Sequence, residues 1–187
     1  MSKSNIHGVE LGITSNVFIR VIDGNTGKYR EYSGHNKATK SLLLGLYNFL
    51  RGRENTTSYD YAPNWLRVGY GTQTPTFLDT VIQIPMYIDG DPSDNYTTGT
   101  DVYQTIQRGK DYLEDTNSIT LAVKFYIASN ELAGSSTTPI EINEIGLFSR
   151  GGIMLARYVL PDAIEKYDND FIDITWEISM TSIGDGE

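Results

Sequence analysis

The segment "DFIDITWEISM", residues 170–180, alternates apolar and polar side chains along its length. Its apolar set consists of Ile172, Ile174, Trp176, Ile178 and Met180. Successive side chains of a strand point to opposite faces, so this pattern predicts an antiparallel strand with one buried and one solvent-exposed face. The segment "SITLAVKFYIA", residues 118–128, alternates in the same way. Together the two segments favour a β-rich fold.

A hairpin is expected near the N-terminus. Residues 15–22 and 28–33 have strand composition and flank "DGNTG", residues 23–27. Asp, Gly and Asn tolerate the positive φ that tight turns require, so the flanking segments are predicted to pair as a β-hairpin.

Two more strands and a connector follow in the middle of the chain. "NWLRVGYG", residues 64–71, has the composition of a strand, and residues 72–80 form the expected connector. Residues 81–88 have strand character but contain Pro85. Proline cannot donate to a ladder, so this segment is predicted to be an edge strand or to break there.

The sequence contains one good helix candidate, the segment "NKATKSLLLGLYNFLRG", which starts at residue 36. Its apolar residues recur at spacings of three and four, and they are Leu42, Leu43, Leu46, Phe49 and Leu50. Asn36 can cap the first amides, and Gly52 suits the residue that ends a helix. We expect a helix near residues 36–51 with one face on a sheet. The whole pattern predicts a mainly β protein, an antiparallel, jelly-roll-like β-sandwich with this one helix.

The stretch "NEIGLFSRGGIMLAR", residues 143–157, is expected to form a second hairpin. Ile142 and Ile145 fall on opposite faces of a regular strand, and one inserted residue would reconcile them. This predicts a β-bulge near Asn143–Glu144. The turn is placed at residues 149–152, and the return strand at residues 153–160. Pro161 is expected to end that return strand.

Glu144, in the first strand of this hairpin, allows two interpretations. As a catalytic carboxylate it would need a second carboxyl about 5–9.5 Å away in a glycosidase-like site. Glu141, three residues earlier, lies on the opposite face of a regular strand. As a structural carboxylate it would accept backbone N–H bonds at the bulge or pair with Arg157. The structural interpretation is favoured, and no catalytic residue is predicted.

Composition narrows the classes of function. The chain has 187 residues, which fits a single domain over residues 1–187, and it has no cysteine for disulfides or thiolate chemistry. A net charge of -9 argues against a nucleic-acid partner. The apolar run at residues 42–50 is too short to span a membrane, so no membrane partner is expected. "DGDPSDN", residues 89–95, lacks the glycine and glutamate of an EF-hand loop, and neither a metal nor a cofactor is predicted.

Tyrosine is the one enriched residue type, with 13 copies. Exposed tyrosine favours interfaces because it combines a large contact area with a hydroxyl group. The alternative is that these rings pack at sheet edges with the hydroxyl in water. The possible interface residues in predicted loops are Tyr59, Tyr61, Tyr87, Tyr96 and Tyr103, with Tyr70 beside them.

Several segments, taken in order, resemble the tail-collar fibre and related small virion proteins of tailed bacteriophages. They are "LRVGYGTQTPTFLDT" (66–80), "INEIGLFSRGGIMLARYVLP" (142–161) and "IEKYDNDFIDITWEISM" (164–180), which follow the helix ending in "LRGR" (50–53). The family shows a "GxGTxxPTxxDT" stretch, an "EIGLF" strand, a glycine turn, an "LAR" return strand and a lysine before the last strand. The principal matching residues are Gly69, Gly71, Thr76, Asp79, Glu144, Gly146, Arg157 and Lys166.

The resemblance implies a bacteriophage virion structural protein, located in the virion after assembly in the host cytoplasm. Its motif residues look architectural, since glycine permits close backbone approach and Asp79 can bond turn amides. The chain ends in "TSIGDGE", which leaves no room for a fibre shaft, so a compact tail or collar connector or adaptor subunit is expected. Its partners would be other virion proteins and copies of itself in a symmetric assembly.

Two other functions stay open beside this one. The protein could decorate the head, or it could be a carbohydrate-binding β-sandwich module. An enzyme is the least favoured class, because no paired carboxylates or nucleophile motif stand out. The N-terminal hairpin, residues 1–33, lies outside the resemblance and is a candidate docking element.

Overall fold

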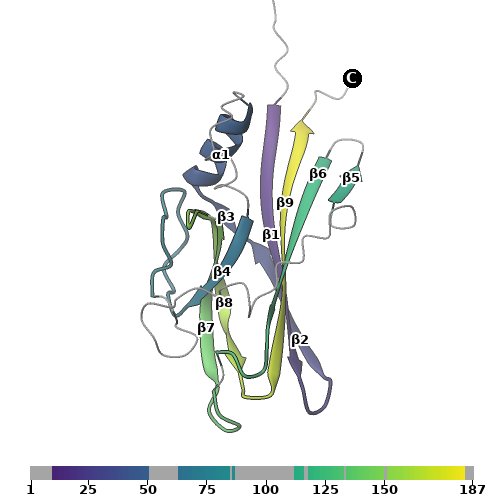
Figure 1. The fold of residues 1–187 in the computed structure, drawn as a ribbon, viewed down its shortest axis with the longest axis vertical. Helices are drawn as coiled ribbons and strands as arrows, with labels where there is room; N and C mark the ends of the chain where they lie inside the picture. The colour runs from purple at the N-terminus through teal and green to yellow at the C-terminus, as the bar shows by residue number, and fades with distance from the viewer. Residues whose placement is uncertain are drawn as a thin grey trace, which may run out of the picture.

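The computed structural model describes residues 10–50, 63–84, 86, 112–115, 118–132, 134–149 and 151–183. It shows a mainly β fold, a sandwich of two antiparallel sheets with one helix, which confirms the predicted fold class (Figure 1). The five-stranded sheet has the order β2-β1-β9-β6-β5 and the four-stranded sheet the order β3-β8-β7-β4.

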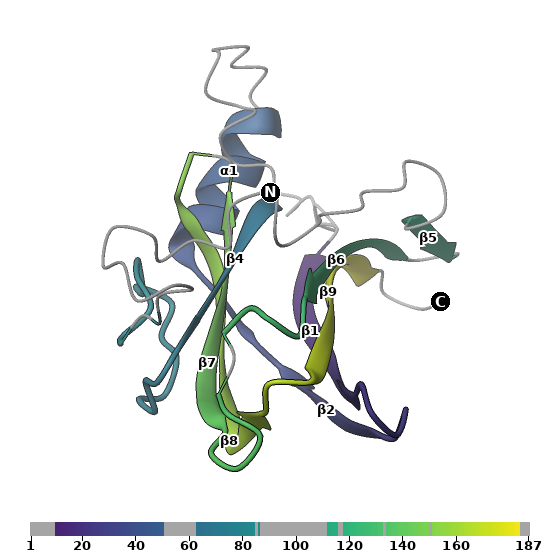
Figure 2. The ribbon, with the colours of Figure 1, turned by 60° about the horizontal axis from the view of Figure 1, so that its bottom comes forward.

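The first sheet comprises β1 (Glu10–Asp23), β2 (Tyr29–His35), β5 (Tyr112–Asp115), β6 (Ser118–Ile127) and β9 (Asp170–Ile183). The second comprises β3 (Lys37–Ala38), β4 (Pro63–Gly69), β7 (Ile140–Ser149) and β8 (Met154–Lys166). Helix α1 (Lys40–Leu50) follows β3 directly and lies against β8. A second view separates the two sheets, with β7 and β8 in one and β1, β6 and β9 in the other (Figure 2).

The core lies between the two sheets and contains side chains from both. The period-two alternation of the sequence is confirmed in β6 and β9, where Val123, Phe125 and Trp176 are buried. The indole of Trp176 is fully buried, and its Nε1 donates a hydrogen bond to Ser15 Oγ at 2.9 Å. The largest side chain of the core therefore has its polar atom satisfied.

The predicted N-terminal hairpin is present as β1 and β2. Its turn is held by Asp23, whose Oδ1 accepts the Asn25 amide at 2.8 Å, and Gly27 has a φ of 68°. However, β1 is 14 residues long, and each of them pairs with a residue of β9. The hairpin is thus an integral part of the five-stranded sheet, and only the outer edge of β2 is open for docking within the described sheet.

The helix begins at Lys40, so the expected start and cap at Asn36 are wrong. Residues 37–38 instead form β3, which pairs with β8. The buried hydroxyl of Thr39 donates to the carbonyl oxygens of Met154 at 2.7 Å and Leu155 at 3.0 Å. These contacts hold the chain extended up to the first helical residue. The expected helix end at Gly52 lies outside the described residues.

Helix α1 contacts the core through Leu42, a residue of the predicted apolar stripe. By contrast, Leu43, Leu44 and Tyr47 are exposed. The apolar stripe of the sequence is therefore only partly used within the sandwich.

The predicted strand at residues 81–88 is not formed where the structure describes it, at residues 81–84 and 86. Two backbone hydrogen bonds join this segment to the end of β4. Tyr70 N donates to Ile84 O at 2.8 Å, and Met86 N donates to Val68 O at 3.0 Å. No ladder develops because the amides of Gln83 and Ile84 donate to a side chain, Glu144.

The β-bulge expected near Asn143–Glu144 is confirmed as a register shift between Ile142 and Glu144. The extra residues lie mainly on the partner strand, because Ile142 pairs with Ile164 and Glu144 with Val159. Pro161 falls in that unpaired stretch, where its missing N–H breaks no ladder hydrogen bond. This explains why β8 continues to Lys166, and the expected end of the strand at Pro161 is wrong.

The turn between β7 and β8 lies where the glycines predict it. Gly152 has a φ of 75°, and its amide donates to Ser149 O at 2.9 Å. Glycine is the residue that adopts this left-handed conformation without steric cost, so the turn fixes the alignment of the two strands.

Lys166, at the end of β8, is fully buried. Its Nζ donates to Ser129 O at 3.0 Å, which ties the end of β8 to the loop after β6. Burial lowers the pKa of Lys166 to about 8, although the carboxylates of Asp170, Glu131 and Asp168 partly offset that effect. An ammonium group is therefore held inside the protein at a cost that depends on pH.

That cost predicts an unusual pH dependence of stability. The folded chain releases the Lys166 proton near pH 8, whereas the unfolded chain keeps it up to a pKa of 10.5. Between these values the unfolded state binds more protons, so this residue makes unfolding harder as the pH rises. We expect wild type to gain roughly 2 kcal/mol relative to Lys166→Met between about pH 7 and about pH 9.5.

Urea unfolding of both proteins at the two pH values measures this difference. Lys166→Met is the matched variant, because it keeps an unbranched side chain of similar length and has no titrating group. The lost hydrogen bond to Ser129 O affects the stability equally at both pH values to a first approximation. A stability difference between the two proteins that is the same at both pH values would contradict the prediction.

Candidate functional site: a buried carboxylate that fastens a loop

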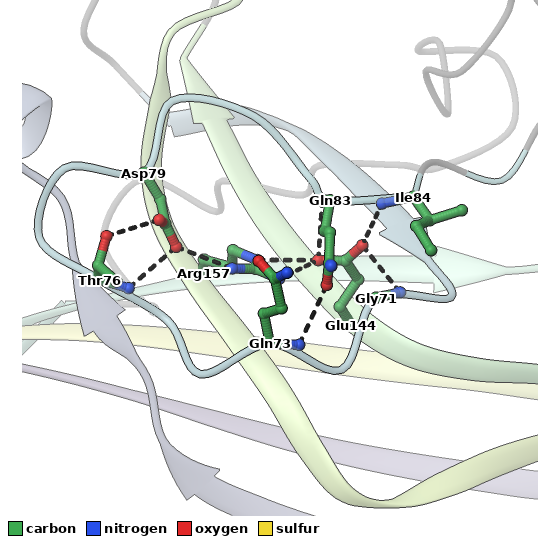
Figure 3. A network of polar contacts seen from close by, with 8 residues as sticks. All are labelled: Gly71, Gln73, Thr76, Asp79, Gln83, Ile84, Glu144 and Arg157. Carbon is green, nitrogen blue, oxygen red and sulfur yellow. Dashed lines mark hydrogen bonds and ion pairs between the residues drawn. The ribbon is translucent and has the colours of Figure 1, made fainter.

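Glu144 is fully buried on β7, between β4 and β8. Its Oε1 accepts the amides of Gly71 at 3.0 Å and Ile84 at 2.8 Å. Its Oε2 accepts the amide of Gln83 at 3.1 Å. One carboxylate thus binds three amides from the two ends of a single segment, residues 70–84, which we call the connector (Figure 3).

Arg157, across the hairpin on β8, neutralises that carboxylate. Its Nε donates to Glu144 Oε2 at 2.8 Å, and its Nη2 lies 2.7 Å from the same oxygen as an ion pair without hydrogen-bond alignment. Burial by itself would lower the pKa of Arg157, but hydrogen bonds to Asp79 and Glu144 outweigh it and raise that pKa. The guanidinium therefore stays charged, as a buried carboxylate requires.

Asp79 extends the network into the middle of the connector. Its Oδ2 accepts Arg157 Nη1 at 2.9 Å, and its carboxylate accepts both the amide and the hydroxyl of Thr76, at 3.0 and 2.6 Å. Burial tends to raise the pKa of Asp79, but the hydrogen bonds from Thr76 and Arg157 prevail and lower it. We call the three charged residues Glu144, Arg157 and Asp79 the clamp, because they hold the connector at both ends and at its middle.

Two glycines of the motif make this approach possible. A Cβ on Gly69 would lie 2.7 Å from Glu144 Oε1 and 2.6 Å from Ile82 Cγ2, and a Cβ on Gly71 would collide with the same carboxylate oxygen. Contacts this short are not tolerated by a side chain, so at positions 69 and 71 the backbone can lie against Glu144 only because Cβ is missing. The glycines are needed for space and not for a special φ.

Apolar anchors support the polar network from the other side. Ile82 is buried with Phe148 and Met154, and Met86 joins the main core. The guanidinium of Arg67 lies 4.4 Å from the centre of the Phe148 ring, and burial lowers the pKa of Arg67 to about 10. A Cβ on Gly146 would lie 2.8 Å from Phe148 Cε2, so this glycine makes room for the ring.

The structure brings together the predicted motif residues Gly69, Gly71, Asp79, Glu144 and Arg157, with Gly146 beside them. The predicted pairing of Glu144 with Arg157 is present. The backbone amides that Glu144 binds belong to the connector and not to the bulge, which is a correction. All the oxygens of this carboxylate are occupied by protein donors and shielded from solvent, an arrangement that fixes conformation.

Several predicted features lie outside the described residues. They are the loop at residues 89–95 and the candidate interface residues Tyr59, Tyr61, Tyr87, Tyr96 and Tyr103. Within the part of the chain that the structure describes, no three acidic or histidine side chains gather as metal ligands. No helix there is long and apolar enough to cross a membrane.

Sequence reasoning missed what the connector presents to solvent. Leu78 is 71% exposed and Val81 is 63% exposed, and Phe77 and Ile84 are also exposed. The signal was available in "TFLDTVIQI", residues 76–84, where large apolar residues stand in a segment with turn character. Large apolar side chains on a loop that the fold fastens so firmly are the main surface feature of this region.

No protein-family model, no curated protein and no solved structure matches this chain. The site therefore has to be interpreted from its own geometry.

The clamp predicts a large effect of one isosteric substitution. Glu144→Gln removes the charge that compensates buried Arg157 and turns an amide –NH2 toward backbone donors. Breaking a buried ion pair on one side costs about 3–5 kcal/mol, and we expect a loss of unfolding free energy in that range. Denaturant unfolding followed by tryptophan fluorescence measures it.

Glu141→Gln is the matched control, because Glu141 is an exposed residue on the same strand. Its expected effect lies within about 0.5 kcal/mol. Equal stability of the two variants would show that the clamp does not hold the fold.

Proposed function

We propose that this protein is a bacteriophage virion structural protein, a compact tail or collar connector or adaptor subunit that acts through protein–protein assembly. The observation that carries the proposal is the loop at residues 70–84, called the connector above. Three charged residues fasten this loop, and it exposes apolar side chains. The motif residues that resemble the tail-collar proteins are the residues that build this clamp. The resemblance and the physical arrangement therefore point to the same part of the molecule.

The exposed side chains of the connector suit an interface. The connector exposes large apolar side chains at short intervals along its second half. They are Phe77, Leu78, Val81 and Ile84. Contiguous exposed apolar surface with polar surroundings is typical of protein–protein contact sites. Leaving such side chains in water brings no benefit to the free subunit, whereas burying them against a neighbour favours assembly.

The clamp makes that contact less costly. A loop that must become ordered on binding loses conformational entropy, and this loss weakens the complex. Here three backbone amides and a buried ion pair order the connector before any partner arrives. The binding free energy of the exposed apolar side chains is then available for association.

Repetition and charge fit an assembling subunit. In a symmetric particle one patch is used many times, so modest contacts add up to a stable structure. The net charge of -9 would keep unassembled subunits apart in solution by mutual repulsion. The proposed partners are other virion proteins and further copies of this chain, and the proposal assigns no catalytic step.

Mass spectrometry and immunogold labelling of purified particles test the proposal directly. We expect the protein in the particles at a fixed copy number, with gold at the tail or collar. Labelling on the head surface would favour the head-decoration alternative, and absence from washed particles would overturn the proposal.

A variant of the connector tests the interface itself. Leu78→Ser combined with Val81→Ser removes exposed apolar surface and leaves the clamp intact, so folding should be unchanged. We expect incorporation into particles to fall at least about tenfold, the effect of losing about 1.4 kcal/mol of contact free energy.

Leu44→Ser is the matched control, because Leu44 is an exposed leucine on helix α1, outside the connector. Quantitative mass spectrometry of particles assembled with each variant supplies the comparison. Wild-type incorporation of the double variant would exclude the connector as the assembly surface.

A further inference from the structure

A groove with a volume of about 560 Å³ crosses the outer face of the five-stranded sheet, over β2, β1, β9 and β6. Its main outward-facing side chains are Phe18, Arg20, Glu31, Lys124, Asp173 and Thr175. The volume lies within the range of about 300–1,000 Å³ that is usual for small-molecule sites. This groove has no part in the clamp or the connector.

The strand register places these side chains in two adjacent rows. Arg20 is paired with Glu31 of β2 on one side and with Asp173 of β9 on the other. Residues that pair across strands point to the same face, so a cation stands between two carboxylates. Arg20 donates to Glu31 Oε1 from Nε at 3.1 Å and from Nη2 at 2.7 Å, which orients its guanidinium toward β2.

The neighbouring row is centred on an aromatic ring. Phe18 is paired with Ser33 and Thr175, and Thr175 is paired in turn with Lys124. Its sequence neighbours Val17 and Ile19 are buried in the core, so Phe18 faces away from it and is 45% exposed. A large ring thus stands at the surface among hydroxyl, carboxylate and ammonium groups.

The groove's chemistry selects one class of ligand. Its cations, Arg20 and Lys124, are matched by its carboxylates, Glu31 and Asp173, so it offers no net attraction to a charged molecule. Carboxylates accept hydrogen bonds only, and guanidinium and ammonium groups only donate them. A ligand that satisfies the carboxylates and the cations in the same space needs many groups that both donate and accept hydrogen bonds. It also needs an apolar face to lie against Phe18.

A neutral saccharide has these properties. Its hydroxyl groups donate to carboxylates and accept from cations, and the C–H face of a pyranose ring can lie flat on an aromatic ring. Hydrogen bonds to charged partners are stronger than those between neutral groups, which compensates for a site open to water. We propose that this groove is a binding site for a neutral oligosaccharide, on the sheet that does not carry the connector.

Binding of defined oligosaccharides to the full chain tests the proposal. The probes are maltohexaose, cellohexaose and chitohexaose, with hyaluronan oligosaccharide as an anionic comparison. Saturation-transfer NMR detects contact, and calorimetric titration gives the Kd. We expect at least one neutral probe to bind and the anionic probe to bind more weakly or not at all.

Two groove variants separate the aromatic and the polar contributions. Phe18→Ala and Asp173→Asn should each weaken binding of that probe about tenfold, as is usual for an important contact in a site. Tyr70→Ala is the matched control, since Tyr70 is an exposed aromatic residue of the connector and should bind like wild type. Thermal melting confirms that each variant is folded. If Phe18→Ala does not fold, Asp173→Asn still tests the groove.

The other outcomes overturn the proposal. They are no binding by any neutral probe, equal binding by wild type and both groove variants, or preferred binding of the anionic probe. Oligomers that dissociate in Phe18→Ala without any saccharide binding would assign the face to contact between copies. Failure of saccharide binding leaves the proposed assembly function standing, because the connector is tested by its own variants.

Discussion

The buried ion pair between Glu144 and Arg157 is the interaction on which the rest of this structure depends. A carboxylate that is fully removed from water is tolerated only when a cation and hydrogen-bond donors replace its hydration. Here the cation comes from the partner strand of a hairpin and the donors from the ends of the connector. One ionised side chain on β7 thereby fastens the connector to the sheet that β7 forms with β4 and β8.

This requirement explains several sequence features at once. Glycines at 69 and 71 leave the space through which backbone amides reach the carboxylate. Asp79 completes the coordination of Arg157 and at the same time orders the turn at Thr76. The last residues of the connector form no strand because the amides of Gln83 and Ile84 are already bound to Glu144. A motif that looks like a set of separate turn signals is therefore a single network.

How far the sequence predicts this structure depends on the range of the interaction. Alternation in β6 and β9, the β1–β2 turn and the bulge follow from local patterns, and all were predictable. The Glu144–Arg157 pairing could also be proposed, since both residues lie on one hairpin. Its amide partners Gly71 and Ile84 are 73 and 60 residues away, and no local pattern identifies them.

The errors have the same physical origin, because tertiary contacts override local preferences. Asn36 has good capping chemistry, but pairing of residues 37–38 with β8 delays the helix to Lys40. Pro161 is a strand breaker by itself, but the register shift leaves it opposite no ladder partner. In both places the pairing between strands, and not the local preference, decides the structure.

The two sheets also divide the surface of the molecule into parts with different chemistry. The clamp on the four-stranded sheet orders a loop that exposes apolar side chains, which is suited to contact with a protein. The outer face of the five-stranded sheet instead alternates fixed charges around one ring, which is suited to a hydroxyl-rich ligand. Because the outward-facing side chains of each sheet point away from the core, each outer face can change its side chains without altering the other. A sandwich of this kind can join an assembly with one sheet while the other sheet stays available for a ligand.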